Sequence, residues 1–178
     1  PPAADGCGAS RAKINRDTAT GPAENWRASI QPGGTPGLPN TFPAPPAVLM
    51  LNEIAPAGST SFWLEIINAG NAAAQLAGVQ IASSSGAGPC VLPAGILGPG
   101  SFRVVQAAEL GFTPGASDKL FLYTSNRTAV LDGAGVSARL RGRAPDAAGP
   151  WAYPAVETPG ASNIVQASDA IAINEIMY

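Results

Sequence analysis

Residues 62–68, with the sequence Phe-Trp-Leu-Glu-Ile-Ile-Asn, constrain the fold more than any other part of the chain. In an extended strand alternate side chains point to opposite faces. Leu64 and Ile66 therefore lie on one face, and Trp63 and Glu65 lie on the other. Both faces are largely apolar, which is typical of a central strand that is covered on both sides. The sequence predicts a layered fold around this strand, in which the buried acid Glu65 must find hydrogen-bond partners.

Short apolar runs separated by turn residues extend along the rest of the chain. Its 21 glycines and 18 prolines are spread among these runs and end them before they reach helical length. This pattern predicts an all-β fold, an antiparallel sandwich. We expect one helical turn at residues 107–110 and a hairpin turn at Asp132-Gly133. The predicted strands are residues 48–54, 62–67, 76–82, 90–92, 102–105, 119–123, 129–131 and 136–140.

Two motifs of the chain recur at nearly the same offset. Asn52-Glu53-Ile54 returns as Asn174-Glu175-Ile176, and Thr35-Pro36-Gly37 returns as Thr158-Pro159-Gly160. Such self-similarity indicates tandem repeats. The predicted organisation is the C-terminal part of a preceding repeat at residues 1–40, a Pro-rich linker at 41–47, a complete sandwich at 48–163, a linker at 164–170 and the first strand of a following repeat at 171–178.

Four spaced motifs carry a resemblance to a known family. The pattern Asn-Glu-Ile, a short loop, then Trp-x-Glu-Ile-x-Asn-x-Gly resembles the opening of the lamin-tail domain. Residues 76–81 are similar to a Leu-x-Gly-Trp-x-Leu strand of that family, with Val79 in place of the aromatic residue, and residues 93–100 are similar to its proline-glycine corner. The fourth and most specific motif is the closing Trp151 followed by Thr-Pro-Gly-Ala-Ser-Asn at residues 158–163. The structural motif residues that the resemblance implies are Asn52, Glu53, Trp63, Glu65, Asn68, Trp151, Thr158, Pro159, Gly160 and Asn163.

The resemblance covers nearly all of residues 48–163 and implies an immunoglobulin-like antiparallel β-sandwich. Bacterial members of the family are extracellular and occur in tandem arrays or beside hydrolases, whereas animal members belong to nuclear intermediate-filament proteins. The tandem arrangement of this chain, without a coiled-coil heptad region, resembles the bacterial kind. The resemblance therefore implies an extracellular or cell-surface location in a bacterium.

The composition argues against several classes of function. The net charge is −2 and charged residues make up 12% of the chain, so there is no electrostatic footprint for nucleic acid. The chain has no run of about 18 apolar residues, so no membrane-spanning helix is predicted. Histidine is absent, which removes the commonest general base and metal ligand. We predict no catalytic, cofactor or metal site and no enzyme activity.

The acids Glu53, Glu65 and Asp132 are the most conspicuous polar residues. A pair of carboxylates could bind Ca²⁺ or act as acid and base. The alternative is that Glu65 and Asn68 hydrogen-bond the backbone of loops at a corner of the sandwich. We favour the alternative, because buried polar groups in native folds are nearly always satisfied in this way.

The basic run Arg139, Arg141 and Arg143 is open to two interpretations. Such a row could hold phosphates or an acidic polysaccharide. It could also be an edge strand whose charges prevent edge-to-edge aggregation. Few aromatic residues interleave with the arginines, so the edge strand is the preferred interpretation.

The two cysteines, Cys7 and Cys90, fall in different predicted repeats. A disulfide between them would join one repeat to the next and imply an oxidising compartment. Two buried thiols that act as small apolar groups are an equally good interpretation. Asn126-Arg127-Thr128 also matches the glycosylation pattern, which is a weak signal by itself.

These observations favour a non-enzymatic structural repeat of an extracellular surface or filament-forming protein. The alternative is an accessory module that attaches a larger secreted hydrolase to polysaccharide, cell wall or nucleic acid. We expect self-association through sheet edges, since residues 1–46 and 171–178 have no complete core of their own. The predicted assembly strand is residues 171–178, with its apolar positions at Ile171, Ile173 and Ile176.

Overall fold

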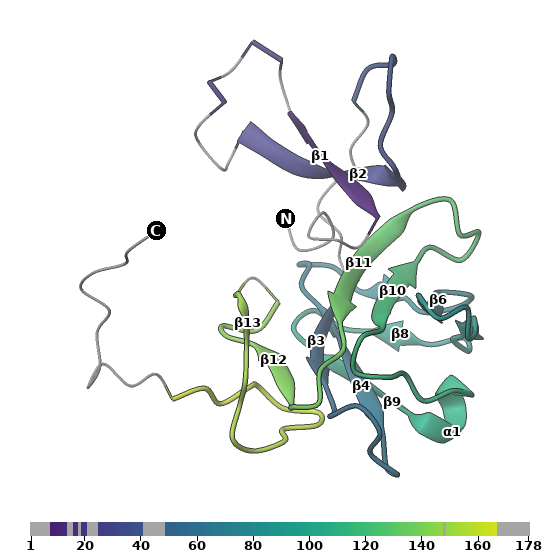
Figure 1. The fold of residues 1–178 in the computed structure, drawn as a ribbon, viewed down its shortest axis with the longest axis vertical. Helices are drawn as coiled ribbons and strands as arrows, with labels where there is room; N and C mark the ends of the chain where they lie inside the picture. The colour runs from purple at the N-terminus through teal and green to yellow at the C-terminus, as the bar shows by residue number, and fades with distance from the viewer. Residues whose placement is uncertain are drawn as a thin grey trace.

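The computed structural model describes residues 8–13, 16–17, 19–20, 25–40, 49–147 and 149–166. Over these residues the chain is mostly β, and all of its strand pairs are antiparallel (Figure 1). The strands are β1 (Ala9–Lys13), β2 (Trp26–Pro32), β3 (Leu49–Ile54), β4 (Trp63–Asn68), β5 (Ala74–Gln75), β6 (Gln80–Ser83), β7 (Cys90–Val91), β8 (Ile96–Leu97), β9 (Phe102–Gln106), β10 (Lys119–Tyr123), β11 (Val130–Gly135), β12 (Arg141–Arg143) and β13 (Trp151–Ala152).

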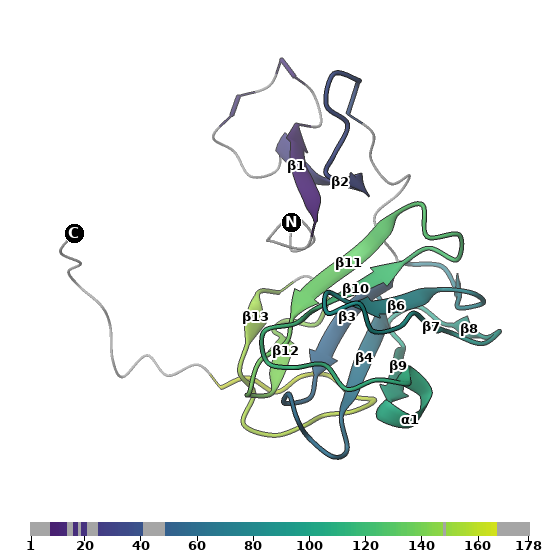
Figure 2. The same ribbon diagram turned by 45° about the vertical axis from the view of Figure 1, so that its right-hand side comes forward.

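Two sheets form a sandwich-like body. One has the strand order β13-β12-β3-β4-β9 and the other has the order β11-β10-β6-β7, and the two lie against each other in both ribbon views (Figures 1 and 2). Alternate residues of their strands share one apolar core, as the period of two predicts. The fully buried members of this core are Leu51, Ile54, Phe62, Leu64, Ile66, Ile81, Val105, Leu120 and Leu122.

Strand β4 is the central strand that the sequence predicts. It pairs with β3 on one side and β9 on the other, and each of its six residues is buried. Leu64 and Ile66 belong to the core between the sheets. Glu65 lies on the opposite face of the sheet, where another part of the chain must cover it.

A bulge in β3 sets up the polar side of this sheet. Leu51 pairs with Ile66 and Glu53 pairs with Glu65, so Asn52 is an extra residue on β3 with no counterpart on β4. Two residues of a bulged strand oppose one residue of its partner, and the strand bends there. Asn52 and Glu53 are therefore presented together opposite Glu65.

Two predicted elements are confirmed and one is split. Strand β10 spans residues 119–123 as predicted, and the helical turn is α1 (Ala107–Leu110). The predicted strand at residues 76–82 is wrong in its first half. Val79 N–H donates to Leu76 O at 3.0 Å, which closes a turn with Gly78 at φ +77°. This turn separates β5 from β6. Gly78 permits it, because glycine adopts a positive φ without strain.

The predicted hairpin at Asp132-Gly133 is wrong. Strand β11 continues through both residues, which pair with Leu122 and Phe121 of β10. The loop between β10 and β11 lies before them, where Thr124 N–H donates to the Ala129 carbonyl oxygen at 3.1 Å. Asp132 is buried and ion-paired, so it cannot occupy an exposed turn. Residues 136–140 form no strand, and the chain next pairs at β12.

The N-terminal strands β1 and β2 form a separate two-stranded sheet. Lys13 lies opposite Trp26 in this hairpin, and a bulge interrupts the register between Ala9 and Arg11. The hairpin lies next to β11 at the edge of the sandwich (Figures 1 and 2). Among the described residues, no helix has the length and apolar character needed to cross a membrane.

Candidate functional site

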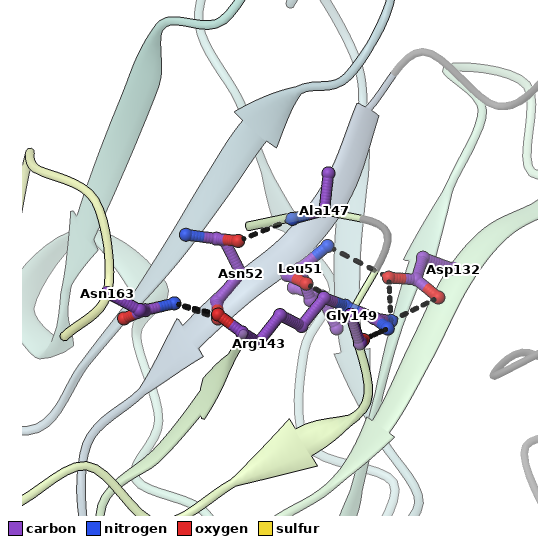
Figure 3. Close-up of polar contacts among 7 residues, drawn as sticks. All are labelled: Leu51, Asn52, Asp132, Arg143, Ala147, Gly149 and Asn163. Carbon is purple, nitrogen blue, oxygen red and sulfur yellow. Dashed lines mark hydrogen bonds and ion pairs between the residues drawn. The ribbon is translucent and has the colours of Figure 1, made fainter. Parts of the chain in front are cut away.

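An ion pair substitutes for a missing strand beside β3. Strand β12 pairs with β3 only at Glu53 and Ile54, which leaves the polar backbone groups of Leu51 beyond its end. Leu51 N–H donates to Oδ2 of Asp132 at 3.0 Å, and Nε of Arg143 donates to the Leu51 carbonyl oxygen at 2.8 Å (Figure 3). The two side chains thereby satisfy backbone groups that a neighbouring strand would otherwise satisfy.

The same two side chains bind each other across the sheets. Nη2 of Arg143 lies 3.0 Å from Oδ2 of Asp132, with both residues almost fully buried. Nη1 of Arg143 donates to the Gly149 carbonyl oxygen at 3.3 Å, and the guanidinium lies 4.6 Å from the centre of the Trp151 ring. Burial raises the pKa of Asp132, and the charge of Arg143 opposes that rise. Each charge is thus stabilised by the other, and removing either would leave a buried charge unpaired.

Asn52 connects β4 to the loop between β12 and β13. Its Nδ2 donates to Oε1 of Glu65 at 3.1 Å and to Oδ1 of Asp146 at 3.0 Å. Its Oδ1 accepts from Ala147 N–H at 2.9 Å (Figure 3). The other oxygen of Glu65 accepts from Gly160 N–H at 2.6 Å. One amide and one carboxylate therefore hold two separate loops on the outer face of the sheet.

Glu53 and Asn163 fix the segment that follows β13. The carboxylate of Glu53 accepts from Thr158 N–H, with Oε1 at 3.0 Å and Oε2 at 3.2 Å. Nδ2 of Asn163 donates to the carbonyl oxygens of Asn52 at 3.1 Å and Arg143 at 3.0 Å. Asn163 therefore joins β3 to β12 at the point where their pairing stops.

The hydrogen bonds around the Thr158 hydroxyl favour a protonated Glu53. Its Oγ1 lies 2.9 Å from Oε2 of Glu53 and 3.1 Å from Oδ1 of Asn163, but a hydroxyl has one proton to donate. Asn163 uses its Nδ2 for two carbonyls, so its Oδ1 can only accept. A proton on Glu53 satisfies both contacts, since Glu53 then donates to Thr158 and Thr158 donates to Asn163.

The environment of Glu53 agrees with this proton arrangement. Burial is the main cause that raises the pKa of Glu53 to about 7, and the charges of Glu65 and Glu157 add to it. Hydrogen bonds from Thr158 act in the opposite direction. Burial also raises the pKa of Glu65. Glu53 consequently carries its proton at mildly acidic pH.

These contacts define what we call the C-terminal unit, residues 141–147 and 149–163. Its strands β12 and β13 belong to the five-stranded sheet, and the residues after β13 bind the outer face of that sheet, where Nε1 of Trp63 also donates to Oε2 of Glu157 at 3.3 Å. The structure thus brings together most of the predicted motif residues, namely Asn52, Glu53, Trp63, Glu65, Trp151, Thr158, Gly160 and Asn163. Pro159 is exposed between two of them.

Asn68 lies apart from this cluster, at the other end of β4. Its Nδ2 donates to the carbonyl oxygens of Ala72 at 2.9 Å and Leu97 at 2.8 Å, and its Oδ1 accepts from Gly70 N–H at 3.0 Å. Both Glu65 and Asn68 therefore hydrogen-bond the backbone of loops, as the preferred interpretation of these residues expects.

The predicted basic edge strand is wrong. Arg143 is buried, and β12 lies between β3 and β13 and is not an edge. Arg141 lies with its guanidinium 4.9 Å from the centre of the Trp151 ring, and Arg139 lies 4.3 Å from that of Tyr153. The three arginines thus do not form a row for phosphates either. Arg143 is paired with Asp132, and the guanidinium groups of Arg141 and Arg139 lie over two different aromatic rings.

Sequence reasoning missed two members of the cluster, Arg143 as a buried partner and Asp146. Arg143 had a signal, because a buried acid such as Asp132 requires a cation and three arginines follow it closely. Asp146 had none, since Ala144-Pro145-Asp146 has the composition of an ordinary loop. Its role depends on Asn52, which lies 94 residues earlier in the chain.

Of the two cysteines, the structure describes Cys90 as a buried free thiol, which agrees with the interpretation as an apolar group. Its Sγ donates to the Glu109 carbonyl oxygen at 3.3 Å, and burial raises the pKa of the thiol. Cys7 lies outside the described residues, as do the predicted assembly residues Ile171, Ile173 and Ile176.

In the part of the chain that the structure describes, no three acidic or cysteine side chains are grouped so that they could hold a metal ion. Comparisons of the chain with protein-family models, with curated proteins and with solved structures found no match.

Proposed function

We propose that the chain is a non-enzymatic structural module of an extracellular surface or filament-forming protein, built as an immunoglobulin-like β-sandwich of the lamin-tail type. The observation that supports this proposal is the use made of the buried acids. Glu53, Glu65 and Asp132 all accept hydrogen bonds from other parts of the same domain. The carboxyl groups of these acids therefore stabilise the fold through hydrogen bonds.

A hydrolytic pair of carboxylates needs room between its members for substrate or water. The carboxyl groups of Glu53 and Glu65 are instead bound by groups of the domain itself, Thr158 at Glu53 and Asn52 and Gly160 at Glu65. Within the described residues, Nε1 of Trp151 is the one buried side-chain polar atom without a hydrogen-bond partner. A polar network that is otherwise satisfied makes a domain rigid. Rigidity at the C-terminal unit suits a repeat that passes mechanical load to the next module.

Self-association through strand edges is the second part of the proposal. Its support is the small charged fraction of 12%, which leaves little repulsion between copies. Exposed apolar side chains add to it, notably Leu38, Ile96 and Ile164.

The experiment measures assembly and binding on the same material. Sedimentation velocity over a range of concentrations is expected to detect assemblies of the full chain. A glycan array and a panel of nucleic acids are expected to detect no saturable binding. The Tyr153 ring, half-exposed beside Arg139, is the surface that a polysaccharide would use. Saturable glycan binding that Tyr153→Ala abolishes would replace the structural role with that of an accessory binding module.

A further inference from the structure

The N-terminal hairpin with the loop that follows it reproduces the geometry of the C-terminal unit. We call β1, β2 and residues 33–40 the N-terminal unit. Lys13 pairs with Trp26 as Arg143 pairs with Trp151. Nδ2 of Asn40 donates to the Lys13 carbonyl oxygen at 3.0 Å, the same bond and the same length as that from Asn163 to Arg143.

The turns of the two units also agree. Leu38 N–H donates to the Thr35 carbonyl oxygen at 3.1 Å, and Ala161 N–H donates to that of Thr158 at 2.9 Å. The third residue of each turn is a glycine at positive φ, +76° at Gly37 and +82° at Gly160. Cations also lie over the tryptophan of each unit, with Arg11 at 5.9 Å from the Trp26 ring and Arg141 at 4.9 Å from the Trp151 ring. The sequence repeat is therefore also a repeat of hydrogen bonds.

In the C-terminal unit these groups bind a strand with the sequence Asn-Glu-Ile. Strand β12 pairs with β3 through Gly142 opposite Glu53 and Arg141 opposite Ile54. The second amide hydrogen of Asn163 binds the Asn52 carbonyl oxygen, and Thr158 N–H donates to the carboxyl group of Glu53. The unit is thus a receptor for one strand, and β3 is the strand that it holds.

The N-terminal unit has the receptor groups without such a strand. Among the described strands, β1 pairs with β2 alone. Within the described residues, Asn40 Nδ2 has the Lys13 carbonyl as its one acceptor, and the Thr35 hydroxyl donates to the Pro39 carbonyl oxygen at 3.3 Å and not to a carboxylate. In the C-terminal unit the second amide hydrogen of Asn163 and the N–H of Thr158 bind Asn52 and Glu53. The equivalent groups of the N-terminal unit, the second amide hydrogen of Asn40 and the N–H of Thr35, have no acceptor in the described part of the chain.

We propose that the N-terminal unit binds the Asn174-Glu175-Ile176 strand of a second copy of this chain. The register follows from the C-terminal unit, with Ala12 opposite Glu175 and Arg11 opposite Ile176. Asn40 donates to the backbone carbonyl of Asn174, and Thr35 N–H donates to the carboxyl group of Glu175. This inference rests on the proposed assembly function and names the surfaces that produce it.

A strand from a second copy is preferred over the strand of the same chain because of the direction in which the chain continues after β13. In both ribbon views the yellow loop after β13, which precedes residues 167–178, lies at the end of the sandwich away from β1 and β2 (Figures 1 and 2). Binding between copies joins unlike surfaces head to tail, so it can continue from one copy to the next.

The test pairs two variants of the full chain. Asn40→Asp removes the amide donor of the receptor, with Asn71→Asp, an exposed residue, as a control of equal charge. Glu175→Lys disables the strand, with Asp169→Lys as its control. By sedimentation velocity, we expect the wild type and both controls to form assemblies and each variant alone to stay monomeric. A one-to-one mixture of the two variants is expected to form dimers, since it retains one working receptor and one working strand.

Three results would overturn the inference. If both variants assemble like the wild type, copies associate through another surface, and the proposed assembly function survives. If the wild type is monomeric at all concentrations, the inference and the assembly function fail together. If the variants stay monomeric but their mixture does not form dimers, the strand does not bind this receptor in a second copy. Unchanged circular dichroism of each variant is the control that its domain is folded.

Discussion

The two units of the chain have the same local geometry in different surroundings. In the C-terminal unit, Asn163 makes two bonds to main-chain carbonyls and Arg143 is fully buried against Asp132. In the N-terminal unit, Asn40 keeps one of these bonds and is exposed. The hairpin, the turn and the asparagine bond are therefore common to both units, although β1 pairs with β2 alone among the described strands.

Burial and the ion pair come from the rest of the domain. Only a neighbouring sheet can remove Arg143 from water, and only a strand of that sheet can accept the second bond of Asn163. The two units thus share their backbone hydrogen bonds and differ in burial, so equivalent substitutions are expected to affect unfolding of the sandwich in one unit and not in the other.

Arg143→Met is expected to destabilise the sandwich by about 3–5 kcal/mol, because it leaves the buried carboxylate of Asp132 without its partner. Lys13→Met, the equivalent change in the N-terminal unit, is expected to leave the unfolding of the sandwich unchanged. Denaturant unfolding monitored by circular dichroism measures both. Equal effects of the two changes would contradict the comparison.

Asn163→Ala is expected to cost about 1–3 kcal/mol, since it leaves the carbonyl oxygens of Asn52 and Arg143 unsatisfied. The matched change Asn40→Ala removes one exposed bond, so its expected effect on unfolding is below about 0.5 kcal/mol. Both proteins should be measured at concentrations where the chain is monomeric. A large loss from Asn40→Ala would mean that the N-terminal unit already has its strand.

The raised pKa of Glu53 predicts that the stability of the sandwich depends on pH. This dependence comes from the contacts of Glu53 with the C-terminal unit. Its folded pKa of about 7 exceeds the ordinary value of 4.5, so the folded state binds the proton more tightly. The stability from this group is therefore complete below pH 4.5 and is lost as the pH rises through 7. One proton gives a slope of at most about 1.4 kcal/mol per pH unit.

Glu53→Gln keeps the shape and the donor of the protonated acid, so unfolding curves between pH 5 and 8 are expected to show a smaller loss of stability than in the wild type. Part of the loss should remain, because the pKa of Glu65 is also raised. Asp17→Asn, at an exposed acid that is not among the groups shifting the pKa of Glu53, is the control. An unchanged slope in Glu53→Gln would refute the assignment of the proton to Glu53.

Gly160→Ala is expected to cost about 1 kcal/mol, because a side chain is strained at φ +82° and Gly160 N–H must keep its bond to Glu65. Gly37→Ala introduces the same strain at φ +76° in the N-terminal unit. Thermal unfolding of the sandwich should respond to the first change and not to the second. A response to both would show that the two units unfold together.

Strands β4 and β10 agree with the sequence pattern, whereas the Asp132-Gly133 segment does not. The alternation of apolar residues placed β4 and β10 correctly, and it placed Glu65 on the face away from the core. The turn signal of Asp132-Gly133 gave a wrong prediction, because this common turn sequence is part of β11. The turn preference lost because the Asp132 carboxylate is needed by Leu51 and Arg143.

The all-β character and the central strand follow from the order of apolar and turn residues along the chain, because strand formation depends on neighbours a few residues apart. Which side chains meet depends on how the sheets and loops pack. Leu51 and Asp132 are 81 residues apart, Leu51 and Arg143 are 92 apart, and Asn52 and Asn163 are 111 apart. No local pattern encodes such pairs, because they exist only after two sheets and a loop have packed and removed these polar groups from water.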